Sequence, residues 1–232
     1  MDSSKLNENR DARPTVTIVG SGICGMFTGL ALDRRGFDVT IIERDTPPPG
    51  CSANEAFFSW QRRGVAQFRH PHAFLGLMCS VLEENYPDLL EHFFNAGARK
   101  VSFEDSIPDH LRPQYKPEPG DEKMWVLMCR RATMETVLRK YVAQTTSVTI
   151  KNRISVTDII TNENDRQDIV LEGLRVVDHE NNNEKSELFS DIVIDSTGRS
   201  SKFSKWLSKC GIDITEERDD AEIVYYLSLI HI

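Results

Sequence analysis

A glycine-rich run near the start of the chain has the spacing of a phosphate-binding turn. Gly20, Gly22 and Gly25 form the pattern G-x-G-x-x-G, with Ser21 and Cys24 between them. The first glycine of this pattern permits a tight turn, the second lets the backbone approach a pyrophosphate, and the third lets a helix pack closely on a strand. N–H groups at the helix start then favour the phosphates. The run therefore indicates a dinucleotide site, with all five residues as candidate cofactor contacts.

The segments around these glycines match a strand–helix–strand unit. Residues 16–19 are β-branched and apolar, residues 22–35 carry small and apolar residues at helical spacing, and residues 38–43 return as a second strand. Glu43 ends that strand, where a carboxylate can accept both ribose hydroxyls of an adenosine. A glycine-rich turn that binds nothing is the alternative, and the whole constellation disfavours it.

A second set of polar residues follows a later strand. The apolar run at 191–195 ends in Asp195, and a hydroxyl pair, Gly198 and a lysine-rich helix at 202–209 come next. Because ligands of a parallel sheet sit at the carboxyl ends of its strands, we expect Gly198 to lie near the glycine turn. A plain junction between strand and turn fits these residues equally well.

The order of the elements favours one fold class over another. After the first unit come a long irregular stretch, two helical patterns within 72–97, a proline-rich loop at 105–123 and a helix over 133–143; strand-like runs follow at 147–150, 153–160 and 168–177. This order predicts an α/β protein, a glutathione-reductase-type FAD-binding Rossmann fold with a parallel sheet and a β-meander. A plain NAD dehydrogenase would alternate strand and helix more regularly.

Bulk properties exclude several other classes. The net charge of -8 argues against a nucleic-acid partner, since phosphate contacts need a basic face. No apolar run approaches the roughly 20 residues that a transmembrane helix needs. We expect a polar, disordered tail over 1–13 rather than a signal peptide.

The five cysteines carry a further indication. They are odd in number, widely spaced and contain no C-x-x-C, which favours reduced thiols, a cytoplasmic location and no zinc site. Cys24 has no resolving cysteine or base near it in sequence, so a small packing residue is the favoured interpretation over a redox group.

The motifs together resemble the FAD-dependent monooxygenases related to para-hydroxybenzoate hydroxylase, within them the flavin-epoxidase and squalene-epoxidase-like group. Four segments carry the resemblance: the glycine turn with Glu43-Arg44; residues 63–72, similar to R-x-G-V-P-Q-x-R-H-x-H; residues 131–135, similar to R-P-x-L-E; and residues 195–199 with Trp206-Leu207, similar to D-A-T-G-R followed by W-L. Ala66, Ala132 and Ser196 depart from these patterns without removing an expected cofactor contact.

The resemblance implies roles for single residues. Glu43 and Arg44 would bind the adenosine ribose, Arg131 would face the cofactor, and the backbone of Val156 would touch the adenine. Asp195 and Gly198 would close over the pyrophosphate. The helix-opening segment that would line the flavin and substrate cavity supplies three further candidates, Gln67, Arg69 and His70.

The two histidines at 70 and 72 could be metal ligands, but no third ligand follows at suitable spacing. We therefore expect no metal site. No catalytic acid or base is identified, because flavin chemistry needs little from the protein beyond positioning.

The resemblance also implies an activity and an extent. We expect FAD with NAD(P)H as co-substrate, and a monooxygenase that hydroxylates or epoxidises an olefinic or aromatic small molecule. A same-fold flavin reductase is the first alternative, a flavin halogenase is less favoured, and a non-enzymatic adenine-nucleotide binder is the alternative from another class. The FAD domain should span 14–212 with a helical insertion at about 70–125. Residues 213–232 would then begin a substrate-binding β-sheet, with an unpaired strand at 222–227 and a final segment unlike the family, so that the chain is an inactive N-terminal fragment.

Overall fold

The structure, a computed structural model, describes residues 13–50, 52–65, 67–163 and 168–215. A parallel sheet lies at its centre, with the strand order β10-β1-β2-β6. Its strands are β1 (Thr15–Val19), β2 (Asp38–Ile42), β6 (Thr149–Lys151) and β10 (Ile192–Asp195). Each is short and rich in β-branched residues, as strands covered on both faces should be. The strand–helix–strand unit is therefore confirmed, with α1 (Ile23–Asp33) as its helix.

The register brings three strand ends to one edge of this sheet. Val19 lies level with Ile42 on β2 and with Asp195 on β10. Directly beyond these ends, the N–H of Ser196 donates to the carbonyl of Val19 at 2.8 Å. The end of the late strand thus lies beside the glycine turn, as predicted, although more than 170 residues separate them in sequence.

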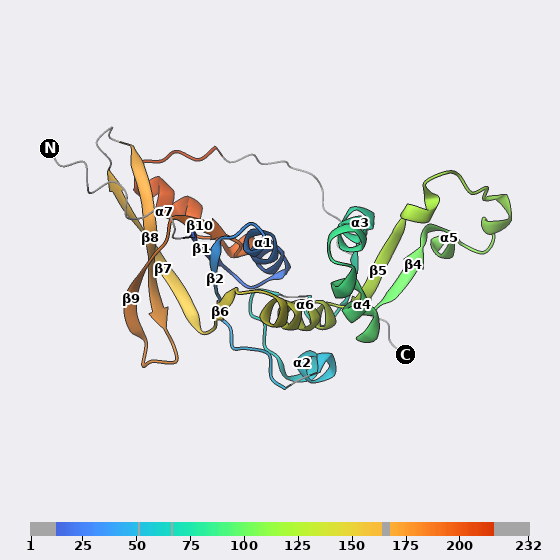
Figure 1. The fold of residues 1–232 in the computed structure, drawn as a ribbon, viewed down its shortest axis with the longest axis horizontal. Helices are drawn as coiled ribbons and strands as arrows, with labels where there is room; N and C mark the ends of the chain where they lie inside the picture. Colours follow the sequence, from blue (N-terminus) through green and yellow to red (C-terminus); the bar gives the residue numbers. More distant parts are fainter. Residues whose placement is uncertain (1–12, 51, 66, 164–167, 216–232) are drawn as a thin grey trace.

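A β-meander covers one face of the parallel sheet and helices cover the other (Figure 1). The meander is antiparallel and consists of β7 (Ile154–Glu163), β8 (Ile169–Asp178) and β9 (Glu184–Phe189). With α7 (Phe203–Lys209) it encloses an apolar layer that includes Ile42, Leu174 and Trp206. β9 is absent from the expected strands because half of its sequence, EKSELF, is charged and nearly all of it is exposed.

The helical layer forms the larger core. It contains α1 and α6 (Arg131–Thr145), with α3 (Gly76–Asn85) and α4 (Pro87–Asn95) packed behind them. Met26, Ile41 and Leu138 are fully buried there. The two helices predicted within 72–97 and the helix predicted over 133–143 are confirmed.

The insertion differs from the expectation in one respect: it contains a sheet. The antiparallel strands β3 (Pro71–Phe74), β5 (Trp125–Arg130) and β4 (Arg99–Ser102) pair in that order. β3 and β4 are four residues each, too short to show an alternating pattern. A further short helix, α2 (Ala53–Ser59), lies in the stretch expected to be irregular. It starts with a reciprocal capping box between Ser52 and Glu55.

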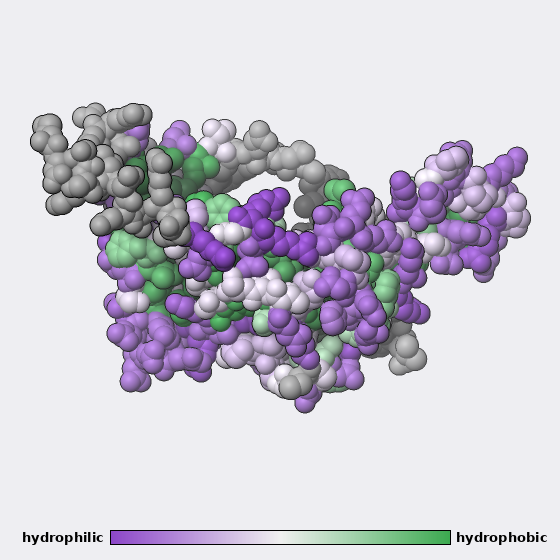
Figure 2. Space-filling view, in the orientation of Figure 1, coloured by the Kyte–Doolittle hydropathy of each residue, from purple (hydrophilic) through white to green (hydrophobic). Residues whose placement is uncertain are grey.

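The part of the insertion formed by β4, β5 and the segment between them extends from the body as an arm (Figure 1). The expected loop at 105–123 contains only short turns of helix, namely the end of α5 (Phe103–Ser106), η2 (Arg112–Gln114) and η3 (Asp121–Lys123), and hydrophilic residues cover most of the arm (Figure 2). An apolar groove of about 310 Å³, here called the arm groove, lies at its base and is lined by Leu75, Val101, Phe103, Met124 and their neighbours. The strand expected at 222–227 lies outside the described residues.

The closeness of α1 to the glycine turn yields a test of the fold. A Cβ at Gly25 would lie 1.9 Å from the carbonyl oxygen of Gly20, whereas one at Gly22 would meet nothing within 4 Å. We expect Gly25→Ala to destabilise the protein by about 2 kcal/mol or more through this overlap. Gly22→Ala should cost at most about 1 kcal/mol, as alanine does at a helix N-cap. Urea unfolding measures both, and equal losses would contradict this packing.

Candidate dinucleotide site

A cavity of about 380 Å³ opens where β1, β2 and β10 end. The elements around it are the glycine turn, the residues after β2, the loop at 62–65, the start of β7, the turn after β10, and α7. Its lining residues are Val19, Gly20, Gly22, Ile23, Cys24, Ile42, Glu43, Arg44, Asp45, Arg62, Gly64, Val65, Arg131, Ile154, Ser155, Val156, Ser196, Thr197, Gly198, Lys202, Phe203 and Trp206.

The glycine turn gives this cavity a wall of backbone. Gly20 has φ +105°, and a Cβ there would lie 2.7 Å from the carbonyl oxygen of Ser196, so both conformation and space require glycine. Gly22, the N-cap of α1, has no side chain that could cap the helix, and the first turn of α1 has no acidic residue. The positive end of the α1 dipole faces the cavity, and no side chain of α1 neutralises it.

Glu43 is fixed directly beneath the turn. The backbone N–H and the hydroxyl of Ser21 donate to its Oε2 at 3.0 and 2.9 Å, and the N–H of Asp45 donates to its Oε1 at 3.0 Å. The Nη1 of Arg62 lies 2.9 Å from the same Oε2. Only 7% of the Glu43 side chain is exposed, so these contacts and the cavity are its whole environment.

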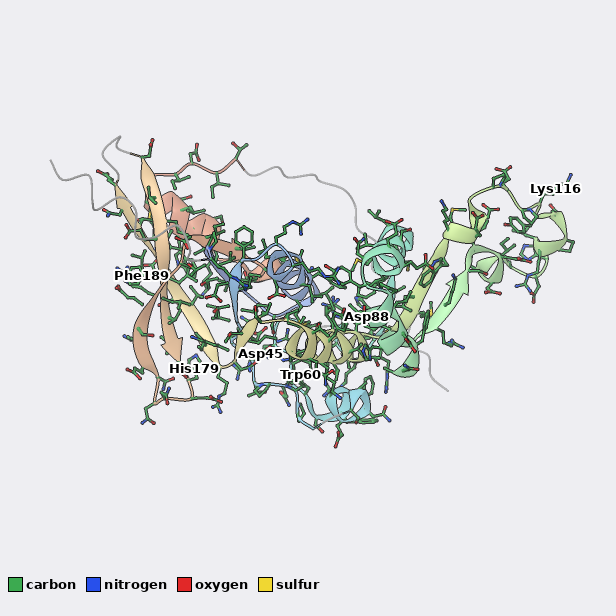
Figure 3. The ribbon with its side chains drawn as sticks, viewed as in Figure 1. Asp45, Trp60, Asp88, Lys116, His179 and Phe189 are labelled. Atoms are coloured by element: carbon green, nitrogen blue, oxygen red, sulfur yellow. The ribbon has the colours of Figure 1, made fainter. Side chains whose placement is uncertain are left out.

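Arg62 links three buried carboxylates. Besides Glu43, its Nη1 contacts Asp45 Oδ2 at 3.2 Å and its Nε donates to Glu135 Oε2 at 2.8 Å. The guanidinium also lies 5.0 Å from the centre of the Trp60 ring, and the indole of Trp60 donates to the carbonyl of Thr46. These contacts attach the loop that carries Arg62 to the chain that leaves β2. Figure 3 labels Asp45 and Trp60 in this region, below α6.

Helix α6 supplies the other half of this polar cluster. Arg131 donates to Glu135 Oε1 at 2.8 Å, one turn along the helix. Arg139 donates to the hydroxyl of Ser21 at 2.9 Å and also bonds Asn152, after β6. We call the residues Ser21, Glu43, Asp45, Arg62, Arg131, Glu135 and Arg139 the strand-end cluster. Its three carboxylates and three guanidiniums balance in charge, as burial requires.

The charges of the strand-end cluster shift the pKa values of its own members. Burial alone would raise the pKa of Glu43, but Arg62 and the N–H groups of Asp45 and Ser21 lower it to about 2. Burial and the charge of Glu43 raise the pKa of Asp45. Burial and the neighbouring Arg62 lower the pKa of Arg139 to about 10. Glu43 is therefore ionised at neutral pH.

The opposite side of the cavity is apolar. Ile154 and Val156 of β7 and Phe203 and Trp206 of α7 lie there, with the two aromatic rings 5.1 Å apart at an interplanar angle of 61°. One end of the cavity thus offers N–H groups and charges, and another offers a surface on which a flat ring can pack.

Most of the expected site residues meet at this cavity. Gly20, Gly22, Cys24, Glu43, Arg44, Arg131, Val156 and Gly198 line it. Ser21 and Gly25 lie just behind it, bonded to Glu43 and packed on Gly20 respectively. Cys24 is exposed on the cavity wall, so the interpretation of it as a packing residue is wrong.

Four expected residues lie elsewhere in the described structure. Asp195 is outside the lining and instead accepts from the N–H of Thr197 at 2.9 Å and from Ser201, which shapes the turn after β10. Gln67, Arg69 and His70 are exposed and outside the lining. Arg69 donates to the carbonyls of Phe57 and Phe58 at the end of α2.

Arg62 and Asp45 are absent from the expected set, although both line the cavity. A signal for Arg62 exists: aligning Gly64 and Val65 with the R-x-G-V motif puts Arg62, not Arg63, at its first arginine. Asp45 carries no such signal, because its contacts depend on where the loop at 62–65 folds back.

Across the described residues, no group of three or more His, Cys, Asp or Glu side chains is placed to hold a metal ion. His72 is one of the two histidines considered as metal ligands, and burial and the charge of Arg131 lower its pKa. Over the same residues, no helix has the length and apolar character to cross a bilayer.

Comparison with known proteins agrees with this geometry. Residues 18–95 match the family described as "NAD(P)-binding Rossmann-like domain". A stretch of 69 residues is 33% identical to the NAD-dependent dihydropyrimidine dehydrogenase subunit PreT of Escherichia coli (strain K12), covering 30% of this chain and 15% of that protein. A shorter stretch of 45 residues is 47% identical to the tRNA 5-methylaminomethyl-2-thiouridine biosynthesis bifunctional protein MnmC of Chromohalobacter salexigens, covering 18% of this chain and 6% of that protein.

Solved structures extend the likeness to nearly the whole chain. THI4 of Thermovibrio ammonificans has a TM-score of 0.53 at 20% identity, covering 87% of this chain and 64% of its own. The probable FAD-dependent monooxygenase pqsL of Pseudomonas aeruginosa has a TM-score of 0.55 at 14% identity, covering 90% and 48%. The flavin-dependent halogenase CmlS has 0.55 at 23% identity, covering 85% and 32%.

The chain has a Rossmann-type dinucleotide-binding fold. The expected fold class, a parallel sheet with a β-meander as in flavoproteins, is confirmed. At these identities the solved structures establish the fold and not the reaction. The chain spans 15% of the length of the PreT relative and about half of the length of pqsL.

The depressed pKa of Glu43 makes stability depend on pH in a defined direction. Its folded-state pKa of about 2 lies below the ordinary 4.5, so its charge stabilises the fold fully above pH 4.5, and this contribution is lost as the pH falls toward 2. The contribution is of the order of 3 kcal/mol. The free energy of unfolding, measured in urea, should therefore fall less for Glu43→Gln than for the wild type between pH 4.5 and pH 2.

The matched control is Glu187→Gln, which removes an exposed carboxylate paired with Arg175. Its stability should follow the wild type at each pH, because exposed pairs contribute little. A Glu43→Gln protein with the wild-type pH dependence would show that Glu43 is not the ionised centre of the cluster.

Proposed function

We propose that this cavity binds the ADP half of FAD and that the protein is an FAD-dependent oxidoreductase. The observation that carries the proposal is the placement of a buried, ionised Glu43 at the end of β2, beside a backbone wall of glycines in one cavity. The matches with NAD(P)-binding and flavin-dependent proteins support FAD, with NAD(P)H as the co-substrate.

The residues present fit the three parts of an ADP group. The N–H groups at the start of α1 and the bare backbone at Gly22 suit a pyrophosphate. Glu43 can accept from a ribose hydroxyl, and Arg44 lies next to it on the wall. The side formed by Val156, Phe203 and Trp206 suits the adenine ring. Glu43 also opposes a 2′-phosphate here, because two anions would then share one buried site.

The chain's own contribution to the chemistry is binding and orientation. When bound, the flavin supplies the redox step, accepting a hydride equivalent from NAD(P)H. The residues described here hold the distal, nucleotide end of that cofactor. Thr197 and Gly198 line the cavity after β10, beside the glycine turn, so they would exclude water from one side of the phosphates of a bound cofactor.

For the reaction itself we propose monooxygenation of an olefinic or aromatic small molecule. The four motifs of the epoxidase-like group and the fold shared with pqsL, described as a probable FAD-dependent monooxygenase, support it. The alternative is a same-fold flavin reductase. Isotopically labelled O₂ separates the two reactions, because a monooxygenase transfers one labelled atom to its product and a reductase transfers none.

The nucleotide assignment predicts a specific loss of binding. Gly22→Val should reduce FAD affinity at least tenfold, because its side chain occupies the space where the backbone meets the pyrophosphate. Glu43→Ala should weaken binding as well. Flavin-fluorescence titration of the purified chain measures both, and ADP, but not FMN, should compete with FAD.

Gly76→Val is the matched control, since Gly76 begins α3 outside the cavity and a Cβ there would make only an ordinary contact, 3.9 Å from the carbonyl oxygen of Lys123. Its FAD affinity should equal that of the wild type. Equal affinity in Gly22→Val, in a protein that remains folded, would contradict the assignment, as would competition by FMN and not by ADP.

A further inference from the structure

Two chains of contacts converge on a single oxygen of Glu43. In the first, Glu135 holds the Nε of Arg62 at 2.8 Å, and the Nη1 of Arg62 reaches Glu43 Oε2 at 2.9 Å. In the second, Arg139 donates to the hydroxyl of Ser21 at 2.9 Å, and that hydroxyl donates to the same Oε2 at 2.9 Å. Both chains start on α6, a helix that carries no expected ribose contact.

The other oxygen of Glu43 is much less occupied. Oε1 accepts from the N–H of Asp45 at 3.0 Å, whereas Oε2 accepts from Ser21 twice and from Arg62. A carboxylate offers about four lone-pair sites in all. The contacts on Oε2 therefore fix the orientation of the group and leave acceptor capacity on Oε1.

We propose that Arg62 is a positioning residue for the nucleotide site: held by Glu135 of α6, it keeps Glu43 charged and oriented toward the ligand. The inference rests on the proposed function, because it concerns the binding of the ADP half of FAD. It adds a residue that acts through Glu43 and does not depend on contact with the nucleotide.

The charged groups around Glu43 single out Arg62 for this role. Asp45 and Glu135 oppose the ionisation of Glu43, and Arg62, Arg131 and Arg139 favour it. Arg131 pairs with Glu135 and not with Glu43, and Arg139 reaches Glu43 only through Ser21. Arg62 is the largest influence that lowers the pKa of Glu43, against the burial that would raise it.

The geometry also requires an arginine. Nη1 lies between Glu43 and Asp45 while Nε faces Glu135, so three carboxylates share one rigid fork. A lysine ammonium is a single point charge on a flexible stem and cannot reproduce this arrangement. It can still compensate part of the negative charge.

The test is the affinity for ADP between pH 5 and pH 8, measured by calorimetry on the whole chain. For the wild type, Glu43 should contribute no pH dependence in this range. In Arg62→Met, Glu43 keeps its burial and loses its counter-ion, so it should protonate within the range. Relative to the wild type at the same pH, affinity should then fall as the pH decreases, approaching about tenfold per pH unit below the raised pKa. Arg62→Lys should restore most of the wild-type profile, which follows the titration of the terminal phosphate of ADP.

Two further variants test whether the pH dependence comes from Glu43 and whether it is specific to Arg62. Arg62→Met combined with Glu43→Gln should bind weakly but with the pH dependence of the wild type, because the glutamine cannot titrate. An extra acid-dependent loss in this double variant would assign the effect to Asp45 and not to Glu43. Arg175→Met removes an exposed arginine paired with Glu187 and should match the wild type throughout. If Arg62→Met does not fold, Arg62→Gln carries the same expectation.

The outcomes separate the two proposals. An Arg62→Met profile parallel to that of the wild type, with affinity lowered equally at every pH, would show a merely structural arginine and overturn the positioning role while leaving the ADP site intact. A wild-type chain that binds neither ADP nor FAD would overturn the proposed function and, with it, this inference.

Discussion

Three carboxylates share one buried guanidinium at the carboxyl end of β2, and the surroundings of the cavity depend on that interaction. Glu43, Asp45 and Glu135 are each at most 6% exposed, and Arg62 contacts all three of them. The same contacts attach three separate segments to one another: the end of the second strand, the loop at 62–65 and helix α6. A buried ion pair of this kind adds little net stability over an apolar core, but breaking it leaves uncompensated charges. Its effect here is to fix the position of the loop at 62–65 against the chain that leaves β2.

The parallel sheet supplies the second constraint. Parallel strands place their carboxyl ends at one edge, and here β1, β2 and β10 end level with one another. The glycine turn therefore has a neighbour from the far end of the sequence, and Gly20 must be glycine because the carbonyl of Ser196 lies against it. The position of the cavity is set by the register of the parallel strands, and the strand-end cluster supplies the charged groups on one side of it.

Local patterns in the sequence predict the parts of this site whose cause is local. Glycine spacing, β-branched runs and an acidic residue at a strand end identify the turn, β1, β2 and Glu43 because each depends on adjacent residues. The placement of β10 is also predictable, since the topology of a parallel sheet leaves few alternatives.

Other features have no local cause. Arg62 and Glu135 are 73 residues apart, and only the folded chain brings them together. β3 and β4 are too short, and β9 too polar, for their pairing to appear as a pattern. Cys24 has the small size of a packing residue, but its place on the first turn of α1 turns it to the cavity. The expected roles of Gln67, Arg69 and His70 come from the resemblance alone, and the described structure does not bring them to the cavity.

The central claim is that the strand ends and the glycine turn form one site for the ADP half of a dinucleotide. Backbone NMR of the ¹⁵N-labelled chain during titration with ADP tests it most directly. We expect saturable shifts at the amides of Gly22, Ile23, Arg44, Val156 and Thr197, with the arm groove unaffected. Shifts confined to the arm groove around Val101 and Met124, or none at millimolar ADP, would contradict it.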